Sequence, residues 1–165
     1  MVRLFLFRHG LAWPHDTPGM EDDERSLTEK GERRVCQVAR GLKRMGLKLD
    51  KIVTSPLPRA AKTAEIVADV LSVPYLLEDS EILRPESSAS EIAAWLKTRG
   101  EKRIMLVGHN PNLSELLSLL TFGQTEPLPV VLKKAGVAAL RDDPAGRFHI
   151  DWIARPRFIR RLREL

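Results

Sequence analysis

The sequence alternates short apolar runs with longer segments in which apolar residues recur at helical spacing. Three of the runs, at residues 2–7, 51–54 and 103–107, have the length and composition of strands buried on both faces of a parallel sheet. A segment with one apolar face follows each run and is typical of a helix that packs on such a sheet. This alternation predicts an α/β fold with a mostly parallel central sheet flanked by helices.

The first predicted helix has clear start and stop signals. Thr28 is a suitable N-cap with acidic residues in the turn that follows, and the apolar face continues to about Arg44 before Gly46 ends the helix. Starts of further helices are expected at Ser55–Pro56, Ser90 and Asn112.

The pattern changes toward the C-terminus. A short strand is expected near 75–77, and two more at 137–140 and 148–153. The residues Asp143-Pro144-Ala145-Gly146 between the last two have the composition of a hairpin turn. We therefore expect antiparallel strands at the end of an otherwise parallel sheet.

Length and composition indicate one globular domain over residues 1–165. Hydrophobic residues make up 43% of the chain and charged residues 30%, and a chain of roughly 150 residues can bury a sizeable core. The first apolar run is too short and too polar for a signal peptide, and no run approaches the roughly 18 apolar residues of a membrane span, so a cytoplasmic location is expected. The single cysteine, Cys36, excludes an intrachain disulfide and cysteine-rich metal modules.

The net charge of +5 is concentrated at one end of the chain. The basic C-terminal segment, residues 155–165, contains five arginines and one glutamate, and the rest of the chain is nearly neutral. A basic face would indicate nucleic-acid binding, but a charge confined to the terminus does not. We expect a solvated terminal helix, with contact to an acidic partner as the alternative, and no nucleic-acid or membrane partner.

Polar clusters follow three of the predicted strands. Arg8-His9-Gly10 ends the first run, Ser55 to Arg59 follows the second, and Gly108-His109 follows the third. Ligands of parallel α/β sheets bind outside the carboxyl ends of the strands, so two histidines and two arginines should converge there.

This set of side chains suits phosphoryl transfer. The planar donor fork of arginine matches phosphate oxygens, and Arg59 falls in a predicted first helical turn, where backbone N–H groups favour an anion. A neutral histidine can attack phosphorus near neutral pH, and a second can stabilise charge on the transferring group by donating a hydrogen bond. The residues therefore predict phosphoryl transfer through a covalent phosphohistidine.

In type and order, these motifs resemble the histidine phosphatase superfamily. Its signature appears as Arg8-His9-Gly10, and the resemblance continues through Ser55-Pro56 with Arg59 to Gly108-His109. Within the superfamily the chain is most similar to the small SixA-type phosphohistidine phosphatases. It has minimal insertions, and its residues 25–31 resemble an Arg-Pro-Leu-Thr-x-x-Gly element, with serine in place of the proline.

The resemblance implies a phosphoglycerate mutase-like fold and a reaction that needs no metal or other cofactor. His9 would be the nucleophile that becomes phosphorylated, while Arg8, Arg59 and His109 would bind the phosphoryl oxygens. The implied partners are phosphohistidine-bearing proteins of phosphorelay systems. A phosphatase for small phosphate esters on the same fold and a catalytically weak phosphate-binding module remain alternatives.

One departure from the family pattern concerns the proton donor. Many members carry an acid in a Leu-x-Glu segment, where this chain has Leu83-Arg84-Pro85. Glu81 and Glu86 are out of register, and His15 or Asp16 could substitute as weak acids. Loss of general-acid help costs about 10²–10⁴-fold for an alkoxide leaving group. An imidazole leaving group needs that help less, so the sequence favours P–N over P–O substrates.

Overall fold

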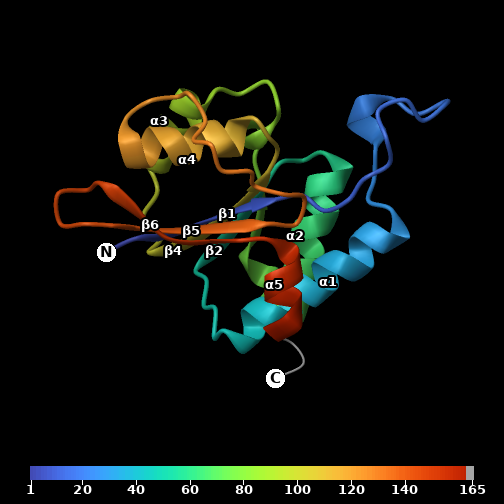
Figure 1. Cartoon of the computed structure of the whole chain (residues 1–165), viewed down its shortest axis with the longest axis horizontal. Helices are drawn as coiled ribbons and strands as arrows, with labels where there is room; N and C mark the ends of the chain where they lie inside the picture. The colour runs from blue at the N-terminus through green and yellow to red at the C-terminus, as the bar shows by residue number, and fades with distance from the viewer. Residues whose placement is uncertain (163–165) are drawn as a thin grey trace.

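The computed structural model describes residues 1–162 and places a mixed sheet between two layers of helices (Figure 1). Within those residues the sheet has six strands in the order β3-β2-β4-β1-β5-β6. The strands are β1 (Arg3–Arg8), β2 (Lys51–Thr54), β3 (Leu77–Asp79), β4 (Arg103–Gly108), β5 (Val137–Asp142) and β6 (Phe148–Ala154). The first four run parallel, and β5 and β6 are antiparallel, which confirms the predicted sheet.

Helices cover both faces of the sheet because its central strands are apolar on both faces. Phe5 and Phe7 of β1 pack toward one helical layer, and Leu4 and Leu6 toward the other. Figure 1 shows α1, α2 and α5 on one side and α3 and α4 on the other. The helices are α1 (Glu29–Arg44), α2 (Pro58–Leu71), α3 (Ala89–Leu96), α4 (Asn112–Phe122) and α5 (Pro156–Arg161). No helix within residues 1–162 combines the length and apolar character needed to cross a membrane.

The first helix starts as predicted, and two later starts differ. The Thr28 hydroxyl accepts a hydrogen bond from Gly31 N–H at 3.0 Å and caps α1. The prediction that Ser55 and Pro56 begin α2 was wrong, because Ser55 N–H donates to Val107 O at 3.0 Å and keeps the chain extended beside β4. The helix begins instead at Pro58, which leaves Arg59 in its first turn as expected.

The other two corrections lie between β2 and β4. Ser88, rather than Ser90, caps α3, because Ser88 and Glu91 exchange the two hydrogen bonds of a capping box. The strand predicted near 75–77 begins only at Leu77. Pro74 starts a 3₁₀ turn (Pro74–Leu76) that occupies the expected positions.

The basic C-terminal segment forms the predicted helix, which is solvated in part and docked on the domain through one residue. Ile159 of α5 is only 1% exposed and belongs to the core beneath α1. A Cβ atom at Gly41 of α1 would lie 2.1 Å from Ile159 O, so glycine is required for this close approach. Arg155 and Arg157 stay exposed, and residues 163–165 of the segment lie outside the described residues.

Candidate active site

The carboxyl ends of β1, β4 and β2 lie side by side and bring the sequence-predicted site residues together. Arg8 pairs in register with Gly108, and His9 N–H donates to Gly108 O at 3.0 Å. The parallel pairing therefore sets the two histidines next to each other, and the ring centroids of His9 and His109 are 5.2 Å apart. Arg59 enters from the first turn of α2, and its side chain is buried.

A threonine that sequence reasoning missed holds the His9 turn against α2. Gly10 N–H donates to Thr63 Oγ1 at 3.0 Å, and the Thr63 hydroxyl donates to Arg59 O at 2.7 Å. Gly10 also has no room for a side chain, because a Cβ atom there would lie 2.5 Å from a methyl group of Val35. These contacts couple the positions of His9 and Arg59.

His9 is held in one tautomer and is neutral near pH 7. Its Nδ1 lies 2.7 Å from Gly10 O, and a carbonyl only accepts, so Nδ1 carries the hydrogen and Nε2 keeps its lone pair. Burial lowers the pKa of His9 to about 3, and the positive charges of Arg59 and Arg8 add to this effect. The ring therefore presents an unprotonated nitrogen that is able to act as a nucleophile.

His109 is oriented by a serine from the neighbouring strand end. Its Nε2 lies 2.9 Å from Ser55 Oγ, and that oxygen also accepts from Leu57 N–H at 3.3 Å. With the Ser55 hydroxyl donating to Nε2, the hydrogen of the neutral ring is on Nδ1. Burial, followed by the charge of Arg59, lowers the pKa of His109 to about 4. Sequence analysis noted Ser55 only as a motif residue and a helix cap, because its contact with His109 is tertiary.

Three polar atoms at this site lack a hydrogen-bond partner within residues 1–162. They are Arg8 Nε, Arg59 Nε and His109 Nδ1, all fully buried. Burial also lowers the pKa of Arg8 and of Arg59 from the usual arginine value. Buried polar groups in folded proteins are nearly always paired, so unpaired donors gathered at one sheet edge indicate a site built for an anion with several oxygen acceptors.

A third arginine, Arg25, belongs to the same electrostatic environment and was missed as a site residue. It is buried, and it donates to Asp22 Oδ1 and to Trp13 O, both at 2.7 Å. Arg59 donates to the Asp22 carbonyl at 2.7 Å and to its Oδ2 at 3.2 Å. Asp22 thus bridges Arg25 and Arg59, and the position of Arg25 at the start of the 25–31 element was the available signal.

Comparisons with a family model, with known sequences and with solved structures together identify the family. A model of the histidine phosphatase superfamily (branch 1) matches residues 4–81. An uncharacterized protein of Picosynechococcus sp. is 40% identical over 147 residues, which cover 87% of each chain. This chain belongs to the histidine phosphatase superfamily. The phosphohistidine phosphatase SixA of Escherichia coli is 26% identical over 158 residues, covering 94% of each chain.

Solved structures of the superfamily agree with the SixA-type branch. The structure of the protein histidine phosphatase SixA complexed with tungstate has a TM-score of 0.84 and 25% identity, covering 96% of this chain and 99% of that one. A phosphoglycerate mutase from Bacillus anthracis shares the fold alone, with a TM-score of 0.75 at 15% identity over 98% of this chain and 96% of that one. The family and its SixA homologues support phosphatase activity.

This histidine phosphatase has no carboxylate from the Leu83–Pro85 segment beside its histidines. Pro85 O accepts from the Asn112 amide at 3.0 Å. Glu81 and Glu86 are exposed and face the Arg84 guanidinium, with N–O distances of 3.7 Å and 3.4 Å. Both neighbouring carboxylates therefore lie close to a cation, in solvent.

The outer rim of the site carries His15. Its Nδ1 lies 2.5 Å from Asp22 Oδ1, and its Nε2 accepts from Arg25 at 3.2 Å, while the ring itself is exposed. Burial disfavours ionisation of Asp22, but the hydrogen bond from Arg25 and the charge of Arg59 outweigh it and lower the pKa of that carboxyl. Asp22 therefore stays ionised near neutral pH.

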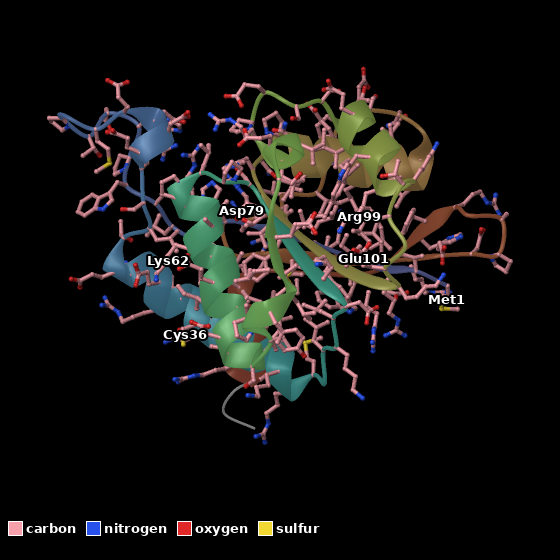
Figure 2. The ribbon with its side chains drawn as sticks, turned by 180° about the vertical axis from the view of Figure 1, so that it is seen from behind. Met1, Cys36, Lys62, Asp79, Arg99 and Glu101 are labelled. Atoms are coloured by element: carbon pink, nitrogen blue, oxygen red, sulfur yellow. The ribbon has the colours of Figure 1, made fainter. Side chains whose placement is uncertain are left out.

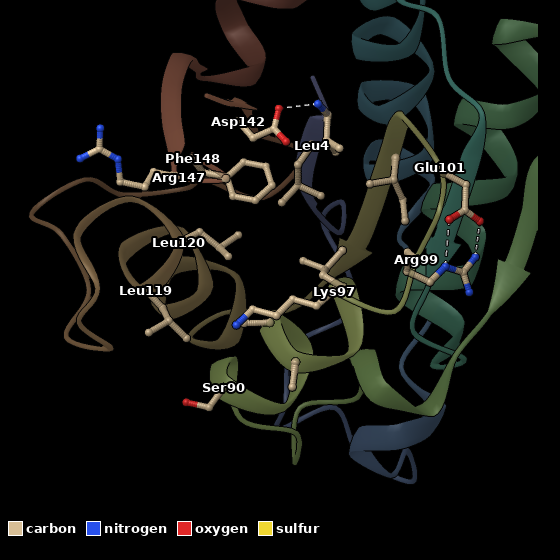
Figure 3. A pocket seen from close by; sticks show the side chains of 16 residues that line it. Leu4, Ser90, Lys97, Arg99, Glu101, Leu119, Leu120, Asp142, Arg147 and Phe148 are labelled. Atoms are coloured by element: carbon tan, nitrogen blue, oxygen red, sulfur yellow. Dashed lines mark hydrogen bonds and ion pairs between the residues drawn. The ribbon is translucent and has the colours of Figure 1, made fainter. Parts of the chain in front are cut away.

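An apolar cavity of about 590 Å³ lies elsewhere, between α3, α4 and the β5–β6 hairpin (Figure 3). Its walls include Leu4, Leu120 and Phe148, toward the amino end of β1. Size and apolarity alone would favour this cavity as a binding site. The histidines and the buried arginines are at the opposite ends of the strands. Within residues 1–162, no three histidine, cysteine, aspartate or glutamate side chains are grouped to hold a metal ion.

Proposed function

We propose that this histidine phosphatase removes phosphoryl groups from phosphohistidine on proteins, through a phosphorylated His9 and without a metal. The observation that carries the proposal is the buried, neutral His9 with a free Nε2, placed beside the unpaired donors of Arg8, Arg59 and His109. A nucleophile and a set of anion-binding donors at one sheet edge are what phosphoryl transfer requires.

In the first step, His9 Nε2 attacks phosphorus as the P–N bond to the substrate imidazole breaks. The bonding electron pair leaves with the substrate nitrogen. Arg8, Arg59 and His109 Nδ1–H donate to the phosphoryl oxygens, where negative charge is concentrated in the transition state. The His9 ring gains positive character, which the Gly10 carbonyl stabilises through its bond to Nδ1–H.

In the second step, water attacks the phosphorus of phosphorylated His9. The bond between phosphorus and Nε2 breaks, phosphate leaves, and the electron pair returns to His9. The same donors hold the phosphoryl oxygens in both steps, because the phosphoryl group stays in place while its neighbours change. Use of the same donors in both steps suits a site whose side chains are held in place by burial and hydrogen bonds.

The preference for a P–N bond follows from the lack of a proton donor. Pro85 supplies no acid, and Asp22 is held ionised by Arg25 and Arg59, so it has no proton to give. An alkoxide would leave slowly from such a site, since general-acid help is typically worth about 10²–10⁴-fold. Imidazole is a far weaker base than an alkoxide and leaves without that help.

The test is phosphate release from a phosphohistidine-bearing phosphotransfer domain in the presence of EDTA, with a phosphoserine peptide as the second substrate. We expect release from phosphohistidine alone, by wild type and not by His9→Ala. Equal release from both substrates would move the function to a general phosphatase for phosphate esters. No release, together with a phosphate-dependent rise in Tm, would identify a binding module instead.

A further inference from the structure

A second charged feature adjoins the site at Arg8. Beside that residue lies a cavity of about 480 Å³, and seven of its ten lining residues are lysine or arginine. We call this cavity the basic groove. Besides Arg8, its cations are Arg34, Lys133, Lys134, Arg155, Arg157 and Arg160. Arg8 therefore lines both the phosphoryl site and the groove.

The groove is assembled from segments far apart in the sequence. Arg34 comes from α1, Lys133 and Lys134 precede β5, and the remaining arginines come from the start and body of α5. The docking of Ile159 against α1 holds α5 at this place. The excess charge that the sequence locates at the C-terminus is thus brought next to the phosphoryl site.

The groove cations are not neutralised by the residues around them. Within residues 1–162 the groove has no acidic lining residue, and none of its seven cations lies within 4.0 Å of a carboxylate of those residues. Elsewhere the same chain pairs its arginines, as Asp22 does for Arg25 and Arg59. Clustered, unpaired cations around a concavity attract an anion and raise its rate of association.

We propose that the basic groove binds acidic side chains of the protein substrate, close to its phosphohistidine. This inference rests on the proposed function, because Arg8 places whatever fills the groove beside the phosphoryl group. Seven cations on several elements match several carboxylates spread over a protein surface. A small phosphate compound carries too few charges to engage all of them, so an acidic protein surface fits the groove better.

The first test measures binding without catalysis. The probe is a fluorescein-labelled octaglutamate peptide, titrated with wild type and with the double variant Arg155→Glu/Arg157→Glu. Both arginines are exposed, and neither is in the proposed catalytic set. The control is Lys48→Glu/Lys102→Glu, which changes the net charge equally on exposed residues at the amino ends of β2 and β4.

We expect the Kd of the peptide to rise at least about tenfold in the groove variant at low salt, and less than about twofold in the control. Equal weakening in both variants would overturn the proposal, because only net charge would then matter. Tighter binding of a single-stranded oligonucleotide of equal charge would also overturn it, in favour of a nucleic-acid surface.

The second test compares two phosphohistidine peptides that differ only in flanking residues, glutamates in one and glutamines in the other. We expect wild type to have a lower KM for the acidic peptide, and the groove variant to lose that advantage with kcat unchanged. Equal KM values for both peptides in wild type would count against the groove. If neither peptide is hydrolysed, the proposed function fails, and octaglutamate binding still decides whether the groove takes acidic side chains.

Discussion

The two ends of the sheet differ in how completely their charged side chains are paired. At the amino ends of the strands, Arg103 and Asp50 lie 2.5 Å apart. Arg99 donates to Glu101 at 2.6 Å, and Figure 2 labels these two residues. At the carboxyl ends, the Nε atoms of Arg8 and Arg59 are buried and unpaired beside two neutral histidines. The amino edge pairs its charges, whereas the carboxyl edge leaves buried donor atoms unpaired even though Asp22 forms an ion pair with Arg59.

The pKa directions express the same contrast. The hydrogen bonds that Arg99 donates to Glu78 and Glu101 raise the pKa of Arg99, so the fold stabilises its charged form. Burial lowers the pKa of Arg8 and of Arg59, so the fold disfavours the charged form of both side chains. A bound anion would stabilise that charged form again. Unfavourably shifted pKa values of this kind are typical of functional sites, where some free energy of folding is lost in exchange for ligand binding.

The largest expected effect comes from removing the nucleophile. His9→Ala should lower kcat for phosphohistidine hydrolysis by about 10⁴-fold or more, because it removes the nitrogen proposed to accept the phosphoryl group. The measurement is phosphate release, together with trapping of an acid-labile phosphoryl-enzyme in wild type. His149→Ala on β6 is the matched control, and it should keep wild-type activity. Turnover by His9→Ala would remove the nucleophile from the mechanism.

Exchanging an arginine at each edge separates binding from stability. Arg59→Met should lower kcat/KM by about 10²–10³-fold, as expected for the loss of a donor to transition-state oxygens. Arg99→Met should leave kcat/KM unchanged and lower the free energy of unfolding by about 1 kcal/mol, because it breaks a partly buried ion-pair network. Steady-state kinetics and urea unfolding of both variants check this prediction. A loss of kcat/KM in Arg99→Met, with unchanged kcat/KM in Arg59→Met, would contradict the difference between the two edges.

The two edges should also respond to different ranges of pH. The folded pKa values of His9 and His109, about 3 and about 4, lie below the 6.5 of an unfolded chain. Between these values the unfolded chain binds more protons, so stability is lost as pH falls from about 7 toward 4, by up to about 1.4 kcal/mol per pH unit for each histidine. The Arg99 hydrogen bond lowers the pKa of Glu101, so its contribution persists to still lower pH.

Urea unfolding at pH 7 and pH 5 measures this slope. His9→Ala and His109→Gln should each flatten it. An unchanged slope in both site variants would mean that these histidines are protonated in the folded protein at pH 5.

The smallest expected effect concerns Asp22, the carboxylate that pairs with both Arg25 and Arg59. Asp22→Asn removes an anion from Arg59 and Arg25, so inorganic phosphate should inhibit a few-fold more tightly. Hydrolysis of phosphohistidine should change by no more than a few-fold. A fall of about 10²-fold or more would instead identify Asp22 as a proton donor.

Local sequence carries much of the fold and of the candidate site. The motif at Arg8-His9-Gly10 and the residues Arg59 and His109 follow strands whose apolar runs are readable, so their convergence could be predicted. The start of α2 was misplaced by local reasoning, because Ser55 has the propensity of a helix cap but is held in extended conformation by its bond to β4. A nonlocal hydrogen bond outweighed the local preference.

By itself, the sequence determined which turns carry the chemistry and that each follows a strand, since apolar periodicity and turn residues act over a few neighbouring positions. Only the tertiary structure decided which groups hold these turns in place: Thr63 beneath Gly10, Ser55 on His109, and Arg25 joined to Arg59 through Asp22. It also converted the arginines of the C-terminal segment into a groove beside Arg8. The physical reason is that hydrogen bonds and charge clusters between distant segments depend on packing, which leaves no periodic signal in the chain.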